Sequence, residues 1–191
     1  MTVAQGRLWN LSKHPNGLTH TFYTLSKGSR LHYVHNPDFS GEISSKGFKN
    51  LVIFLHGFPD SWALWRHYIS SPALRLDNVL IAVDLPGYGG SDGLRSYGAT
   101  EILESVTEFV IGMRKLYGID TELDTASMGA KPGVIIVGHD WGCIIGSRLA
   151  AEAPQLADRF ILSNAPIVRY STTSFSCLCL LALTKRNLSL H

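Results

Sequence analysis

The chain has 191 residues, of which 45% are hydrophobic and 17% charged, and its net charge is +2. It is too apolar to be a disordered chain, and its charge is too small and too evenly spread to favour nucleic acid as a partner. Neither a Gly-X-Y period nor a heptad run is present, which excludes collagen and coiled coils. The length predicts one domain with a sizeable core.

The cysteines and the ends of the chain predict a compartment. Cys143, Cys177 and Cys179 have no metal-ligand spacing, and an odd number of thiols cannot all pair. The N-terminal segment, residues 1–18, lacks the apolar core of a signal peptide. The apolar run at 175–183 is shorter than the roughly 20 residues that span a bilayer. We therefore expect no membrane span, a reducing compartment and a cytoplasmic location.

The first predicted elements are strands. Thr19–His35 contains two alternating runs around a Lys-Gly-Ser turn, which predicts a β-hairpin, and residues 36–50 are predicted to be a loop. Continuous apolar runs farther along indicate strands that are buried on both faces of a sheet. These runs cover Leu51–Leu55, Asn78–Val83, Gly133–Val137 and Phe160–Ser163.

Helical patterns lie between these strands. The clearest is Thr100–Tyr117, in which apolar residues recur at spacings of four and three and Thr100 is the expected N-cap. Shorter helices are expected at Trp62–Ser70 and Cys143–Ala153. The alternation of strands and helices predicts an α/β fold with a mostly parallel sheet over residues 19–166.

The last segment, residues 167–191, differs from the rest of the chain. Past Pro166 there is no amphipathic period and no strand–turn–helix order. We expect this segment to be an atypical tail, such as an alternative or misread end of the gene product. Reading the genomic sequence downstream would test that expectation.

The stretch Val134–Gly146 carries the most chemical information. Gly138 and Gly142 lie two residues either side of Asp140, which is the small–x–nucleophile–x–small pattern of a strained strand-to-helix turn. Such a turn holds the middle side chain above the sheet at a helix N-terminus, where free N–H groups favour a carboxylate. The alternative is an ordinary Asp N-cap that follows a glycine turn.

A second stretch, His56–Trp62, directly follows the first buried strand. A loop in this place can point a backbone N–H at the pocket, and together with the N–H after the nucleophile it forms an oxyanion hole. His56 is a candidate general base. Hydrogen bonding of His56 within the loop is the favoured alternative, because bases in this arrangement come late in the chain.

A third stretch, Asp84–Asp92, lies at another strand end. Gly87 and Gly89 are spaced as in a dinucleotide-binding loop, but Asp92 stands where a third glycine is required and no helix opens there. The stretch is therefore interpreted as a structural turn beside Asp140, with a structural rather than catalytic role for Asp84.

The motifs HGFPDSW, DLPGYGGSD and GHDWG, in this order, resemble the α/β-hydrolase superfamily, and among its members the soluble epoxide hydrolases. The resemblance covers roughly Thr19 to Pro166. It implies that Asp140 attacks an epoxide carbon and forms an alkyl-enzyme ester, with the backbone N–H groups of Phe58 and Trp141 as the oxyanion hole.

The resemblance also implies the surroundings of this site. The substrate would be a small molecule, and no metal or organic cofactor is implied. The pocket would include His56, Trp62 and Trp141, although packing in the core is an equal alternative for Trp62 and Trp65. The tight backbone approaches at the site would be made by Gly57, Pro59, Gly138 and Gly142.

The sequence departs from the family by omission. The acids after Asp140 are Glu152 and Asp158, and the only later histidine is His191, the last residue. Tyr170 is the one later tyrosine, whereas the family's cap supplies two.

We therefore expect a fold truncated before the cap and the last strands, without turnover. The alternatives are a haloalkane dehalogenase-like hydrolase, which shares the Asp nucleophile, a non-catalytic binding protein of the same fold and an inert fragment.

Overall fold

The computed structural model describes residues 17–36, 48–120, 132–167, 176–178 and 181–184. Most of the predicted N-terminal segment and much of the predicted tail lie outside these ranges. So do Tyr170, Cys179 and His191.

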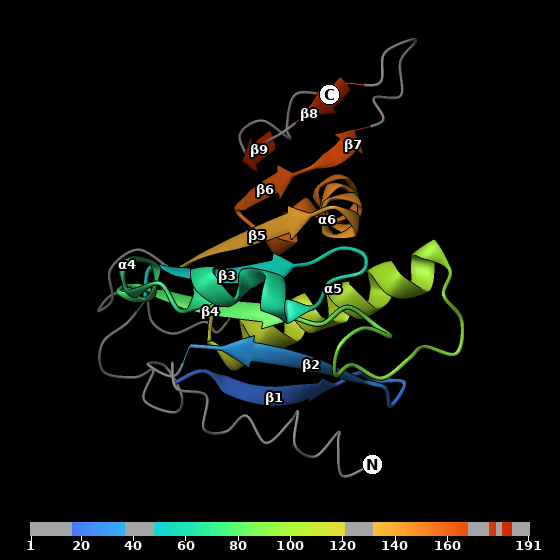
Figure 1. Cartoon of the computed structure of the whole chain (residues 1–191), viewed down its shortest axis with the longest axis horizontal. Coiled ribbons are helices and arrows are strands. Elements are labelled where there is room, and N and C mark those ends of the chain that lie inside the picture. Colours follow the sequence, from blue (N-terminus) through green and yellow to red (C-terminus); the bar gives the residue numbers. More distant parts are fainter. Residues whose placement is uncertain (1–16, 37–47, 121–131, 168–175, 179–180, 185–191) are drawn as a thin grey trace.

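Seven strands form one mixed sheet in the order β1-β2-β4-β3-β5-β6-β9 (Figure 1). They are β1 (Thr19–Thr24), β2 (Arg30–His35), β3 (Asn50–Leu55), β4 (Asn78–Val83), β5 (Gly133–His139), β6 (Arg159–Ser163) and β9 (Leu181–Thr184). The four central strands β4, β3, β5 and β6 are parallel, whereas β2 is antiparallel to β1 and β4, and β9 to β6. The predicted N-terminal hairpin and the mostly parallel α/β sheet are confirmed.

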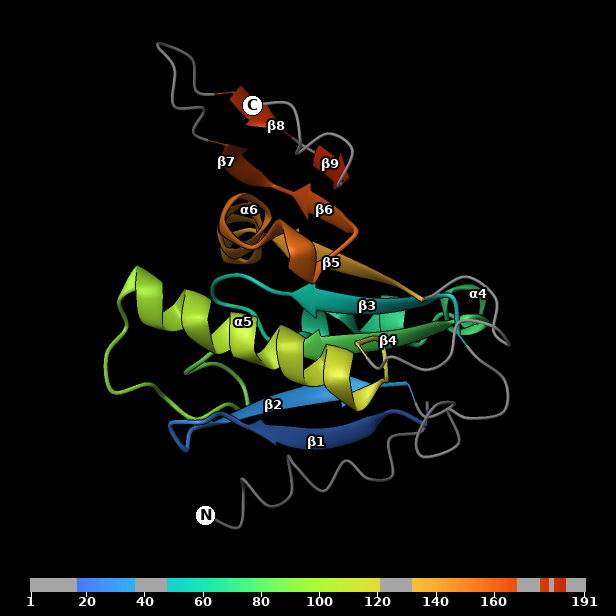
Figure 2. The same ribbon diagram turned by 180° about the vertical axis from the view of Figure 1, so that it is seen from behind.

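Helices lie on both faces of the sheet, which is why β3 and β4, covered on both sides, are apolar along most of their length. On one face lie α5 (Ala99–Leu116), which crosses in front of the sheet in Figure 2, and α6 (Trp141–Glu152). On the other face, η2 (Trp62–Trp65) and α3 (Arg66–Ile69) pack against β3 and β4. The remaining short helices are α4 (Pro72–Arg75) and η3 (Pro154–Leu156).

Two helix starts differ from the sequence-based expectation. α5 begins at Ala99 with Gly98 as its N-cap, so Thr100 lies within the first turn. α6 begins at Trp141, two residues before the predicted Cys143, because the chain enters the helix directly from the turn at Asp140. The expected helix at residues 62–70 is divided into a 3-10 turn, in which Ser61 Oγ accepts from the Ala63 N–H, and one α-turn.

The described parts of the predicted tail contain short strands that no sequence pattern indicated, whereas its atypical origin stays a prediction. β7 (Ala165–Ile167) pairs antiparallel with β8 (Ser176–Leu178), and β9 pairs with β6 from Arg159 to Leu162. The physical reason lies at the sheet edge. β6 would otherwise present a row of unpaired backbone groups on that side, and β9 supplies the partners for them.

Candidate functional site

Three loops lie at the carboxyl-terminal edge of the parallel strands. They follow β3, β4 and β5, which are neighbours in the sheet with β3 between the other two. The carboxyl ends of such strands are the edge at which α/β proteins bind ligands. The three motifs of the sequence, at His56–Trp62, Asp84–Asp92 and Asp140, all lie on these loops. The fold therefore brings them to one place.

The turn at Asp140 joins β5 to α6 through a single residue of strained backbone. Asp140 has a φ of 54° and a ψ of −118°, a conformation that costs a non-glycine residue about 1–3 kcal/mol. A Cβ at Gly138 would lie 2.5 Å from the Gly142 carbonyl oxygen, and one at Gly142 would lie 2.2 Å from that of Leu55. Glycine at both positions therefore allows the sharp turn by which β5 leads directly into α6.

The backbone N–H of Phe58 points at the side chain of Asp140 and donates to its Oδ1 over 2.9 Å. A Cβ at Gly57 would lie 2.3 Å from the same oxygen, so the glycine before Phe58 permits this approach. The peptide bond between Phe58 and Pro59 is cis. Phe58 is 65% exposed. The loop thus offers Asp140 a backbone donor, and Phe58 itself stays largely in solvent.

Trp141 begins α6 directly after Asp140, and it is 53% exposed. N–H groups in the first turn of a helix have no acceptor within that helix, so this end of α6 can serve an anion. Trp141 also lines a pocket of about 420 Å³ between the β4 loop, α5 and α6. Tyr88, Tyr97 and Ile144 line other parts of it, which makes the pocket largely aromatic and apolar.

His56 does not lie in this pocket, because its side chain has no exposed surface. Nδ1 lies 2.7 Å from the Gly57 carbonyl oxygen, which can only accept, so Nδ1 carries the proton. Nε2 accepts from the Leu85 N–H over 2.9 Å. Burial lowers the pKa of His56, which favours this neutral form. His56 is therefore hydrogen-bonded between the two loops, as the favoured alternative expected. It does not line the pocket.

Trp62 likewise lies in the core rather than in the pocket. It is only 9% exposed and packs with Phe54, Trp65 and Ile69 between η2, α3 and the sheet. Its ring meets His20 edge-on, with centroids 5.0 Å apart. Both Trp62 and Trp65 therefore pack in the core, which is the alternative that the sequence left open.

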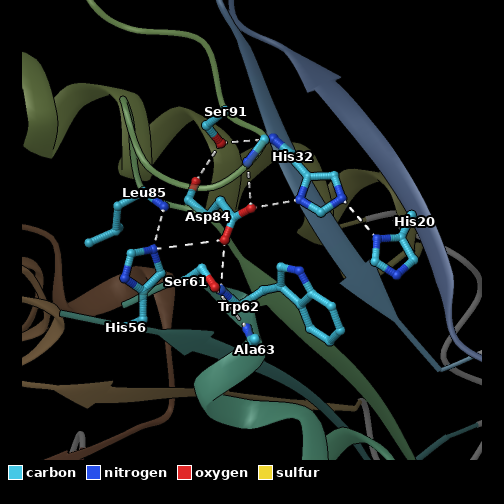
Figure 3. A network of polar contacts seen from close by, with 10 residues as sticks. His20, His32, His56, Ser61, Trp62, Ala63, Asp84, Leu85 and Ser91 are labelled. Carbon is cyan, nitrogen blue, oxygen red and sulfur yellow. Dashed lines mark hydrogen bonds and ion pairs between the residues drawn. The ribbon is translucent and has the colours of Figure 1, made fainter. Parts of the chain in front are cut away.

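Asp84 is the centre of a buried polar network (Figure 3). Its Oδ1 accepts from the Trp62 N–H over 2.6 Å, and its Oδ2 accepts from the Gly90 N–H over 2.9 Å. His32 Nδ1 lies 2.7 Å from Oδ2, and neither side chain has any exposed surface. His20 Nδ1 lies 3.1 Å from His32 Nε2.

No sequence motif marked His20 and His32, the two histidines of this network that lie on the hairpin. They lie on the hairpin, 52 and more positions before Asp84, and only the pairing of β1, β2 and β4 brings them together. The sequence did indicate a structural role for Asp84, and its burial supports that role.

Cys143 is another residue that the motifs did not mark. Its Sγ lies 3.1 and 2.8 Å from the carbonyl oxygens of Gly138 and Ser163, two acceptors that share its single proton. Burial raises the pKa of this thiol to about 11, so it remains protonated and able to donate. The contacts link the first turn of α6 to the ends of β5 and β6, on either side of the strained residue.

Within the ranges that the structure describes, no cluster of three or more His, Cys, Asp or Glu side chains could hold a metal ion. None of the helices found there combines the length and the apolar character needed to cross a membrane. The expected lack of a metal or organic cofactor stays a prediction.

Three known proteins show what this arrangement is similar to. Epoxide hydrolase B of Mycobacterium tuberculosis is 37% identical over 132 residues, which are 68% of this chain and 31% of that protein. The crystal structure of epoxide hydrolase VrEH1 from Vigna radiata matches with a TM-score of 0.57 and 25% identity, over 80% of this chain and 40% of the other. The haloalkane dehalogenase DatA from Agrobacterium tumefaciens C58 matches with a TM-score of 0.55 and 23% identity, over 78% of this chain and 42% of that one, a likeness of fold alone.

The matched proteins are much longer than this chain, which spans about a third of the length of the first curated relatives. Residues 50–176 match the family described as the alpha/beta hydrolase fold. The matched region is more than half of the 191 residues. On this match the chain belongs to the α/β-hydrolase fold family.

Proposed function

We propose that the chain carries the nucleophile of an epoxide hydrolase-like enzyme, and that Asp140 is this nucleophile. The observation that carries the proposal is the 2.9 Å hydrogen bond from the Phe58 N–H to Asp140 Oδ1 at a strained strand-to-helix turn. This bond fixes one carboxylate oxygen and leaves Oδ2 for attack. The similarity to proteins named epoxide hydrolases supports the choice of substrate class.

The proposed first step needs no base, since an Asp carboxylate is ionised at neutral pH. Asp140 Oδ2 forms a bond to an epoxide carbon while the bond from that carbon to the ring oxygen breaks. The released oxygen stays on the substrate as an alkoxide and takes a proton from water. The product of this step is an ester between Asp140 and the opened substrate.

In the proposed second step a water oxygen bonds to the carbonyl carbon of this ester while a base takes the water proton. The bond from that carbon to the substrate-bound oxygen then breaks, which releases the diol and restores the carboxylate. Before that bond breaks, negative charge develops on the former Oδ1, which the Phe58 N–H already faces. The Trp141 N–H at the start of α6 is the second proposed donor. Each donor of this kind contributes about 2.7–4 kcal/mol to lowering the barrier.

Hydrolysis also needs a base, and the described carboxylates downstream of Asp140 are engaged elsewhere. Glu152 pairs with Arg148 on α6. Asp158 accepts from the Val134 N–H over 2.8 Å, toward the opposite end of β5. We therefore propose that the 191-residue chain by itself stops at the ester.

Mass spectrometry after incubation with styrene oxide tests the proposal. We expect one equivalent of adduct, on the peptide that contains Asp140, and none in an Asp140→Asn variant of equal thermal stability. Repeated turnover to the diol would contradict the arrest at the ester. A folded wild-type chain without any adduct would contradict the role of Asp140. Halide release from a haloalkane, with no epoxide adduct, would favour dehalogenase-like chemistry instead.

The state of Cys143 supports a proposed location. Its thiol is buried and free, as is usual for proteins of a reducing compartment. We propose that the protein is cytoplasmic. Fractionation of cells that express it, followed by detection of the intact chain, tests this location.

A further inference from the structure

The loop that carries Phe58 is fixed at both of its ends to the loop after β4. Before Phe58, His56 Nε2 accepts from the Leu85 N–H over 2.9 Å. After Phe58, the Trp62 N–H donates to Asp84 Oδ1 over 2.6 Å. Asp84 and Leu85, which are adjacent in the loop after β4, thus hold both ends of the loop that carries Phe58. The position of the Phe58 N–H relative to Asp140 depends on these two anchors.

Hydrogen-bond donors also occupy Oδ2, the second oxygen of the Asp84 carboxylate. The Gly90 N–H and the His32 ring both bond to Oδ2, at 2.9 and 2.7 Å. Asp84 is fully buried, so water has no access to replace any of these donors. A carboxylate oxygen can only accept, and therefore the proton of His32 sits on Nδ1.

Further contacts hold His32 in the orientation that points Nδ1 at Asp84. Ser91 Oγ accepts from the His32 N–H over 2.9 Å and donates to the Asp84 carbonyl oxygen over 2.6 Å (Figure 3). His20 Nδ1 approaches His32 Nε2 from β1, with the two rings stacked at 5.2 Å. Contact with His20 on β1 supports the His32 ring, and Ser91 of the loop after β4 holds the His32 backbone beside Asp84.

We propose that Asp84 is a positioning residue, oriented by the Nδ1–H of His32, that holds the Phe58 N–H against Asp140. This inference rests on the proposed role of Asp140 as the nucleophile. Asp84 itself touches neither Asp140 nor substrate in this scheme. It acts through the peptide backbone between Trp62 and Phe58.

Replacement of Asp84 by Asn is expected to disturb the loop, because this position needs a group that only accepts hydrogen bonds. The two oxygens of Asp84 face three donors, on Trp62, Gly90 and His32. The amide nitrogen of Asn is itself a donor, so in either orientation it faces at least one of those N–H groups. The loop must then move away, and a displacement of about 1 Å at a reacting group slows a reaction on the order of 100-fold.

Two matched pairs of variants test the inference. Asp84→Asn is compared with Asp92→Asn, the same change in the same loop at an exposed ion pair with Arg30. His32→Leu removes the donor to Asp84. His32→Asn retains it, because the Asn amide nitrogen and His Nδ1 are both two bonds from Cβ. The readouts are the rate of ester formation with styrene oxide and the ¹⁵N–¹H resonance of the Phe58 amide.

The expected result is the same displacement of the Phe58 resonance in Asp84→Asn and His32→Leu, with ester formation slowed on the order of 100-fold. His32→Asn and Asp92→Asn are expected to stay close to the wild type. A folded Asp84→Asn with an unchanged resonance and rate would overturn the inference, and so would a His32→Asn as slow as His32→Leu.

Failure of the proposed function remains distinguishable from failure of this inference. If the wild type forms no ester, the resonance of Phe58 still reports whether Asp84 positions its N–H. If Asp84→Asn does not fold, the comparison of His32→Asn with His32→Leu gives the answer alone.

Discussion

The carboxylate of Asp140 and the backbone of Gly57 lie so close together that no side chain fits between them. An alanine Cβ at position 57 would lie 2.3 Å from Oδ1 and 2.4 Å from Cβ of Asp140. We expect Gly57→Ala to push the carboxylate off the Phe58 N–H and to slow ester formation on the order of 100-fold. Mass spectrometry over a time course with styrene oxide measures this rate.

Gly133→Ala is the matched control for Gly57→Ala, at the other end of β5. There the nearest atom to a new Cβ is a side-chain oxygen of Asn50, at 3.0 Å, which is able to move. Ester formation is expected to remain near the wild-type rate in this variant. Equal rates for Gly57→Ala and Gly133→Ala would mean that the close approach to Asp140 has no chemical role.

The residues of the candidate site differ in how visible they were in the sequence. Asp140 could be singled out because glycines at fixed spacing mark a strained turn, and the structure has that turn. His32 carried no such mark. It becomes important only because β2 pairs with β4 and places it beside Asp84, a contact across 52 positions of sequence. Local residue patterns do not predict which distant strands will pair.

At the scale of an element, α5 connects the hairpin to the centre of the sheet. Phe109 is fully buried, and its ring contacts those of Tyr23 on β1 and Tyr33 on β2, at 5.7 and 5.4 Å between centroids. We expect Phe109→Ala to lower the free energy of unfolding by about 3–5 kcal/mol, through lost burial and the cavity that remains. Urea denaturation followed by circular dichroism measures the change.

Ile111 provides the control on the same helix, because it is 47% exposed. Ile111→Ala is expected to change the free energy of unfolding by no more than about 0.5 kcal/mol, as is usual for surface positions. A loss of similar size at Phe109 and Ile111 would contradict the packing of α5 against the hairpin.

The elements were predictable to different degrees for physical reasons. The apolar runs of the central strands alone revealed them, although only β3 and β4 are buried along most of their length, whereas β5 and β6 alternate between buried and partly exposed residues. The apolar period of α5 revealed its body but not its start, because Gly98 caps it through backbone geometry with no side-chain bond. β9 was missed because its sequence has no alternating pattern. Its pairing with the edge strand β6 depends on tertiary context.

For the whole molecule, buried histidines predict a dependence of stability on pH. Burial lowers the pKa of His35 and of His56 in the folded protein, whereas both return to about 6.5 when the chain unfolds. As the pH falls below that value, the unfolded chain takes up protons that the folded chain does not. Stability is therefore greatest above about pH 6.5 and declines below it, by at most about 1.4 kcal/mol per pH unit for each histidine.

Urea denaturation between about pH 8 and pH 5 measures this decline. Asp92 does not interfere, because a hydrogen bond from Arg30 lowers its pKa below 3.8 and its contribution is lost only in stronger acid. His35→Gln is expected to reduce the slope of the free energy of unfolding against pH, because it removes one of the two histidines that burial keeps neutral. A stability that stays flat over this range would mean that the folded chain binds as many protons as the unfolded one, which would contradict the prediction.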